Sequence, residues 1–232
     1  MMVSASNNLG IIIVFMKYAI YDFDGTLLQA QTVPMILKHW EQSDLPQKQF
    51  KTIKRRIYTR YILQKLKVFG IQRERFRYWA MQQVGQLFGS VSFDQLSVFL
   101  DSLYEESKKS LHKKLVKQIQ KDKVDGYTTI LLSGNFDVCL ERYRSLGFDY
   151  ILGTTLFNPD GKVKTNLEIL TAKHKVPAIE KQFKGFIWSK TKAYSDSYAD
   201  LDLLKKAKEA ICVNPDRRLT AYAKANQWRI IL

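Results

Sequence analysis

Residues 18–28 read Tyr-Ala-Ile-Tyr-Asp-Phe-Asp-Gly-Thr-Leu-Leu, and this stretch predicts more about the fold than any other. Its apolar beginning, residues 18–21, is typical of a buried strand in a parallel sheet. Two carboxylates, Asp22 and Asp24, follow at once, and Gly25 then allows a sharp turn. Taken alone, this could be an ordinary acidic turn after a strand. Because ligands of open α/β sheets bind at the carboxyl ends of strands, the same residues could also hold a divalent cation beside a nucleophile.

The rest of the chain divides into a helical half and an alternating half. Residues 29–124 carry apolar side chains at helical spacing in roughly four runs, and Pro34 suits the first turn of one helix and Pro46 a position near the start of another. After Gly126, short β-branched or apolar runs alternate with helical stretches. The expected strands are 128–133, 150–152, 154–157, 191–194, 211–213 and 229–232. The expected helices are 136–146, 167–183 with a break or a new start at Pro177, and 215–226.

Strands that alternate with helices predict an α/β fold, a Rossmann-like parallel sheet covered on both faces. The first strand precedes the helical block and the others follow it, so the block is expected to be an inserted cap domain. We therefore assign residues 16–28 and 125–232 to the α/β core and residues 29–124 to a helical cap above the first strand's carboxyl end. Residues 1–15 are treated as an N-terminal extension without assigned function, since their apolar part is too short to span a bilayer.

The composition is that of a soluble globular protein, with 46% hydrophobic and 25% charged residues among 232. The only cysteines, Cys139 and Cys212, are too few for a disulfide framework and lack metal-ligand spacing. This usage favours a reducing, cytoplasmic setting. The three histidines are scattered, which argues against a histidine metal cluster.

The net charge of +15 is the unusual property of the chain. Between Lys48 and Arg77 there are eleven Lys or Arg residues and one acid, Glu74, and residues 108–123 carry seven lysines and one acid. Such a field attracts polyanions or an anionic membrane surface. It is equally compatible with solvated helix faces that keep the protein soluble.

Three further segments carry groups that suit the chemistry of residues 22–26. Ser133-Gly134-Asn135 lies where a strand is expected to end and a helix to begin, and there a hydroxyl and free backbone N–H groups can bind an anion. Residues 173–176 offer a lysine to a phosphate. Residues 193–200 bring Asp196 and Asp200. Three or four carboxylates around one hard cation suit Mg²⁺, which takes oxygen ligands.

The motifs occur in a characteristic order. The most specific motifs are residues 22–27 (Asp-Phe-Asp-Gly-Thr-Leu), residues 193–201 (Ala-Tyr-Ser-Asp-Ser-Tyr-Ala-Asp-Leu) and residues 213–219 (Val-Asn-Pro-Asp-Arg-Arg-Leu), the last of which is followed by Trp228. Together they resemble the haloacid dehalogenase superfamily, specifically its phosphoserine-phosphatase-like branch, in which a helical cap is inserted after the first motif. The resemblance covers nearly the whole chain from Met16 onward.

This resemblance implies roles for the residues. Asp22 would be the nucleophile that forms an aspartyl-phosphate. Asp24 would protonate the leaving alkoxide and then activate water, and its presence favours phosphate-ester hydrolysis over dehalogenation. Mg²⁺ would be ligated by the carboxylates of Asp22 and Asp196 and by the backbone carbonyl of Asp24, with Asp200 acting directly or through water. Ser133, Gly134 and a lysine would bind the phosphoryl group; Lys175 fits this lysine best and Lys173 is the alternative.

We therefore expect a Mg²⁺-dependent phosphomonoesterase that acts on a small organic phosphate. One alternative keeps this chemistry on a lipid or membrane-surface phosphate, because the cap is basic. A second is a non-catalytic module that binds nucleic acid through basic residues interleaved with aromatic ones, although these aromatics repeat at helical spacing as core residues do. Phosphoserine itself is a weak expectation as substrate, since family members dedicated to it commonly carry Ser where this chain has Gly25.

Overall fold

The computed structural model describes residues 16–67 and 72–232. Expectations for residues 1–15, and for Phe69 and Gly70 as the end of a helical run, lie outside these ranges.

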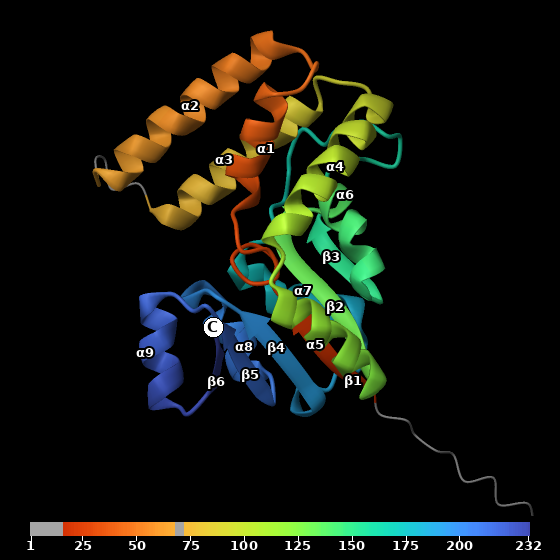
Figure 1. The fold of residues 1–232 in the computed structure, drawn as a ribbon, viewed down its shortest axis with the longest axis vertical. Coiled ribbons are helices and arrows are strands. Elements are labelled where there is room, and N and C mark those ends of the chain that lie inside the picture. The colour runs from red at the N-terminus through yellow and green to blue at the C-terminus, as the bar shows by residue number, and fades with distance from the viewer. Residues whose placement is uncertain (1–15, 68–71) are drawn as a thin grey trace, which may run out of the picture.

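The core is a six-stranded sheet in the order β3-β2-β1-β4-β5-β6, with every neighbouring pair parallel (Figure 1). The strands are β1 (Lys17–Tyr21), β2 (Tyr127–Phe136), β3 (Tyr150–Thr154), β4 (Thr191–Ser195), β5 (Glu209–Val213) and β6 (Arg229–Ile231). This confirms the predicted parallel α/β sheet. The order also places β1 beside both β2 and β4, although more than 100 residues separate β1 from β2 in the sequence.

Strand β1 is buried on both faces, which explains its uninterrupted apolar sequence. Tyr18 and Ile20 belong to a cluster with Ile179, Leu203 and Leu219 from the helices α7 (Ala172–Gln182), α8 (Leu201–Lys206) and α9 (Arg217–Ala225). Ala19 and Tyr21 belong to a second cluster with Leu115 and Ile119 of α5 (Lys113–Val124). Helices therefore cover both sides of the sheet and hold the carboxyl end of β1 in a fixed place.

Four helices stand beyond the carboxyl ends of the strands (Figure 1). They are α1 (Thr32–Glu41), α2 (Gln47–Lys65), α3 (Arg73–Phe88) and α4 (Phe93–Ser107), and we call them the cap helices. Their shared core is built on Trp40, Phe50, Phe88 and Phe99. Pro46 lies at the N-cap of α2, as its position in the sequence suggested.

The fifth helix of the predicted cap, α5, packs on the sheet instead. Its buried residues Leu115 and Ile119 share a cluster with β1, and the 3-10 turn Lys108–Ser110 separates it from α4. We therefore propose that the boundary between cap and core lies at this turn rather than at residue 124.

Several predicted elements have different bounds. The helix expected over 136–146 begins at Asp137, because β2 continues to Phe136, and it consists of a short α6 (Asp137–Leu140) followed by a 3-10 segment. Of the strand expected over 154–157, Thr154 belongs to β3, and the other residues form only one bridge, between Phe157 and Val163. Helix α7 begins at Ala172 and passes through Pro177 without a break. The preceding residues Leu167 and Ile169 are instead buried among the cap helices.

In the described part of the chain, none of the helices combines the length and the apolar character needed to cross a membrane.

Candidate active site

The nucleophile predicted from the sequence, Asp22, is the first residue after β1 and is buried. Its backbone N–H donates to the carbonyl of Tyr194 at 3.0 Å, which continues the pairing of β1 with β4. Because these two parallel strands end side by side, the segment after β4 brings Asp196 to the same place.

Thr26 connects the two carboxylates. Its Oγ1 lies 3.1 Å from Asp22 Oδ2 and 3.2 Å from Asp196 Oδ1, and it accepts the backbone N–H of Asp196 at 2.9 Å. A hydroxyl has one proton, so it can donate to only one of these carboxylates at a time. Burial, and next the charge of Asp22, raise the pKa of Asp196 to about 7.

Lys175 lies on the other side of Asp22. Its ammonium donates to Asp22 Oδ1 at 2.6 Å and to Asp200 Oδ2 at 2.8 Å, and the side chain is only 6% exposed. Asp200 also accepts the Ser195 hydroxyl at 2.7 Å. Burial opposes the charge of Lys175, but Asp200 and Asp22 outweigh it and raise the lysine's pKa. The alternative lysine, Lys173, is exposed.

Asp24 is bound to the beginning of the cap helices. Its Oδ1 accepts the backbone N–H of Thr32 at 2.8 Å and also the Thr32 hydroxyl, so it caps α1 in place of Gln31, whose side chain makes no capping bond. Asn135 donates to the same hydroxyl at 3.0 Å. Burial raises the pKa of Asp24 to about 6, although the bonds from Thr32 act in the opposite direction.

The predicted anion-binding segment ends β2, the other neighbour of β1. Ser133 is buried, and its hydroxyl accepts the backbone N–H of Asn135 at 3.2 Å. A Cβ on Gly134 would lie 2.9 Å from the carbonyl oxygen of Leu170, so this position requires the close backbone approach that glycine permits. The Asn135 side chain holds Thr32 and accepts the N–H of Phe136.

Within residues 16–67 and 72–232, no three acidic, histidine or cysteine side chains are grouped as ligands of one metal ion. Of the four aspartates predicted as metal residues, Asp22 shares Thr26 with Asp196 and shares Lys175 with Asp200. The side chain of Asp24 is bound to Thr32, and that of Asp200 to Lys175 and Ser195.

The carboxylates of Asp22 and Asp196 fit a hard cation. No lysine, arginine or histidine of the described residues forms an ion pair with Asp196, and its raised pKa reflects a charge that burial and Asp22 disfavour. Two carboxylate oxygens in such surroundings are ligands that Mg²⁺ prefers. Asp22 and Asp196 are therefore the side chains that would hold it.

Sequence reasoning missed the roles of Thr32, Ser195 and Arg77. Arg77 lies on α3, donates to Gln31 Oε1 at 3.1 Å, and its charge acts on both Asp24 and Asp196. Thr32 and Arg77 lie in the cap segment, where no motif marks them. Ser195 is part of the motif at residues 193–200, so its position directly before Asp196 was a usable signal.

The geometry defines a class: an α/β protein with buried carboxylates at the end of an interior parallel strand. Comparison with known proteins agrees, since residues 19–205 match the family of haloacid dehalogenase-like hydrolases. The chain belongs to this family.

Individual relatives are similar over different lengths. Phosphoserine phosphatase SerB1 of Mycobacterium tuberculosis is 35% identical over 91 residues, which is 38% of this chain and 30% of that protein. The chain thus aligns with about a third of this relative.

Two solved structures share the fold over nearly the whole chain. A protein of unknown function from Bordetella pertussis Tohama I has a TM-score of 0.78 at 19% identity, covering 94% of this chain and 98% of that one. A phosphoserine phosphatase in its apo form has a TM-score of 0.60 at 19% identity, covering 94% of each.

Gly25 supplies the first testable prediction. It has a φ of +86°, and a Cβ there would lie 2.3 Å from Asp196 Oδ2. We expect Gly25→Ala to displace the Asp196 carboxylate and to weaken Mg²⁺ binding about tenfold or more, measured by calorimetry. Gly161→Ala is the matched control, because Gly161 has a φ of +78° with nothing within 4 Å. Equal Mg²⁺ affinity in the two variants would show that the close approach at Gly25 does not position Asp196.

Proposed function

We propose that the chain is a Mg²⁺-dependent phosphomonoesterase that hydrolyses a small organic phosphate through an aspartyl-phosphate on Asp22. The observation that carries this proposal is the position of the buried Asp22 between a fixed cation, Lys175, and the carboxylate of Asp196, which has no ion-pair partner among the described residues. A carboxylate can approach a phosphate dianion only where positive charge offsets their repulsion. Membership of the family and the fold shared with a phosphoserine phosphatase support it.

In the first step, Asp22 attacks the phosphorus atom and the ester oxygen leaves. Asp24 donates a proton to that oxygen, and its pKa of about 6 keeps a useful protonated fraction near neutral pH. Ser133, the N–H groups after it and Lys175 would hold the phosphoryl oxygens. Bound Mg²⁺ would supply charge neutralisation between the phosphoryl group and the carboxylates.

In the second step, Asp24 is ionised and takes a proton from a water molecule, which attacks the phosphorus atom and releases Asp22. The same carboxyl group thus acts as acid and then as base. Its hydrogen bonds to Thr32 fix its position and connect it to α1, so the beginning of the cap helices helps to hold the catalytic acid.

We propose a small substrate because the cap helices stand over the strand ends, where the candidate active site lies. Arg77 brings a positive charge from α3 toward Asp24 and Asp196, so a substrate with a second anionic group near its phosphate would be favoured. A panel of phosphorylated metabolites, assayed for kcat/KM, tests this preference. Uniform rates on neutral and anionic phosphate esters would contradict it.

Metal dependence should vary with pH in a defined direction. Burial and Asp22 raise the pKa of Asp196 to about 7, and a proton there competes with Mg²⁺. Below this pKa the Mg²⁺ concentration for half-maximal activity should therefore rise, by about tenfold per pH unit at most. Above pH 8 it should become constant.

The measurement is hydrolysis of p-nitrophenyl phosphate against Mg²⁺ concentration at pH 6, 7 and 8, with EDTA as the blank. Asp202→Asn, which changes an exposed aspartate close by in sequence, is the control and should reproduce the wild-type pH dependence. Turnover that survives EDTA, or a half-saturating Mg²⁺ concentration that is the same at pH 6 and 8, would count against the proposed site.

A further inference from the structure

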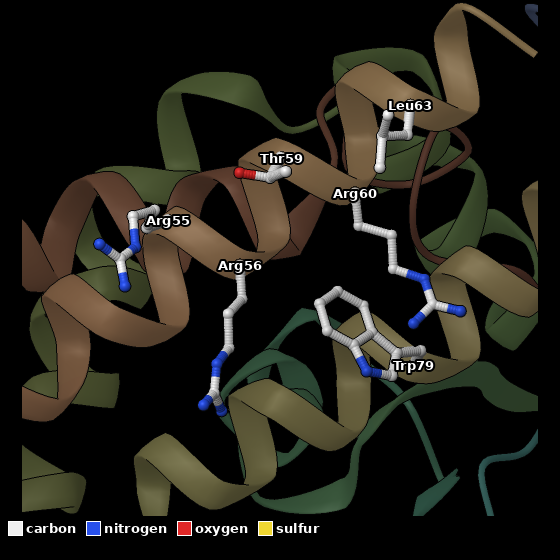
Figure 2. A pocket seen from close by; sticks show the side chains of 6 residues that line it. All are labelled: Arg55, Arg56, Thr59, Arg60, Leu63 and Trp79. Carbon is white, nitrogen blue, oxygen red and sulfur yellow. The ribbon is translucent and has the colours of Figure 1, made fainter. Parts of the chain in front are cut away.

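A pocket of about 390 Å³ lies between the cap helices α2 and α3. Its lining residues come only from these two helices and not from the segments 22–26, 133–135, 173–176 and 193–200 that form the candidate active site; they are Arg55, Arg56, Thr59, Arg60, Leu63 and Trp79. Figure 2 shows Arg56 and Arg60 extending from α2 on either side of the Trp79 indole, with Arg55 further along the helix.

This pocket carries concentrated positive charge without an acid to balance it. Three of its six lining side chains are arginines, and helix α2 contains no Asp or Glu at all. In the described part of the chain, no carboxylate forms an ion pair with any of the three arginines. Arg56 and Arg60 are four residues apart, a spacing at which like charges on a helix repel each other. A bound anion would remove this repulsion.

Arg60 is held in place by an aromatic ring rather than by an acceptor. Its guanidinium carbon lies 4.6 Å from the centre of the Trp79 ring. Its Nε atom is buried and has no hydrogen-bond partner among the described residues. A cation–π contact orients a guanidinium but leaves its charge and the N–H donors of its two terminal nitrogens available. The side chain is therefore positioned for a ligand without being neutralised by the protein.

We propose that this pocket binds the phosphoryl dianion of a second molecule, separate from the phosphate that is hydrolysed. Guanidinium groups bind phosphate oxygens through paired N–H donors, and two or three of them around one pocket favour a multiply charged phosphate over a halide. The pocket is also larger than one phosphate needs, so it has room for a further group on the ligand, either another phosphate or an organic part.

The phosphoryl group could belong to a free small molecule or to a lipid headgroup, and two experimental arms distinguish these sources. In the first, pyrophosphate is titrated into the protein with EDTA present, and binding is followed by tryptophan fluorescence and by calorimetry at constant ionic strength. In the second, sedimentation with phosphatidic acid vesicles is compared with sedimentation with phosphatidylcholine vesicles. Neither arm involves turnover, so both are independent of the proposed phosphatase activity.

The test variant is Arg56→Gln, since Arg56 is exposed and its replacement should not disturb the cap core. Arg75→Gln on α3 is the matched control, because Arg75 is also exposed but does not line the pocket. We expect Arg56→Gln to weaken binding about tenfold and Arg75→Gln to leave it nearly unchanged. Arg60→Lys keeps the charge but loses the paired donors, and it should also weaken binding.

Pyrophosphate binding that depends on Arg56 supports a free ligand, and vesicle binding with the same dependence supports a headgroup. Two outcomes would overturn the proposal. One is the absence of both kinds of binding in a protein whose thermal unfolding is normal. The other is binding that Arg56→Gln and Arg75→Gln weaken equally, which would show only the general attraction of a basic surface.

Discussion

Asp22→Asn should abolish hydrolysis of a phosphate monoester while the protein stays folded. The amide cannot attack phosphorus as a carboxylate does, and loss of a catalytic nucleophile lowers kcat by roughly 10⁴-fold or more. The fold should tolerate the change, because burial raises the pKa of Asp22 and an uncharged group is easier to bury there. Lys175 would still keep Asp200 as its anionic partner.

The measurement is kcat on p-nitrophenyl phosphate with saturating Mg²⁺, together with thermal unfolding of each variant. Asp202→Asn serves as control, since Asp202 is exposed and its loss should change kcat little. If Asp22→Asn retained turnover within a few-fold of this control, Asp22 would not be the nucleophile.

Lys175→Met should cost both activity and stability. The lysine is the cation that compensates Asp22 and Asp200, and all three side chains are less than a tenth exposed. Removing one partner of a buried ion pair typically destabilises a protein by about 3–5 kcal/mol, because the remaining charge has no partner. Activity should fall as well, since the phosphoryl group would lose its fixed cation.

The loss of stability in Lys175→Met should depend on pH in a definite direction. Without Lys175, the pKa of Asp22 in the folded protein should rise further above its unfolded value. A carboxyl group with a raised folded-state pKa favours the folded state at low pH, and this contribution disappears as the pH rises through the folded-state value. Urea unfolding should therefore show a larger difference between Lys175→Met and wild type at pH 8 than at pH 5.

Two further variants separate the structural effect from the catalytic one. Lys173→Met removes an exposed lysine two residues earlier and should behave like wild type. In Lys175→Met/Asp200→Asn, one of the two unpaired carboxylates is gone, so stability should recover in part while activity does not. Equal behaviour of Lys175→Met and Lys173→Met in both assays would contradict the assignment of the phosphate-binding lysine.

The sheet could be predicted from the sequence because its signals are local. An apolar run such as residues 18–21, buried on both faces, differs plainly from the amphipathic helices around it. Helix α8 was not anticipated because its six residues are too few to show a helical period. The place of α5 was also missed, since amphipathic periodicity shows that a helix is buried on one face but not what that face packs against.

The candidate site was predictable to the extent that its residues lie in motifs at strand ends. Asp22, Ser133 and Asp196 follow from that rule, because β2, β1 and β4 are neighbours in the sheet. The contacts between segments were not predictable. Nothing in the sequence shows that Asp24 caps α1 through Thr32, or that Asp200 accepts a hydrogen bond from Lys175.

The most direct test of the account is to locate the phosphoryl group on the protein during turnover. The enzyme would be quenched in acid while it hydrolyses p-nitrophenyl phosphate and digested, and its peptides analysed by mass spectrometry. The account predicts a hydroxylamine-labile phosphoryl adduct on Asp22 that is absent from Asp22→Asn. A stable adduct on another side chain, or on Asp24 in place of Asp22, would contradict it.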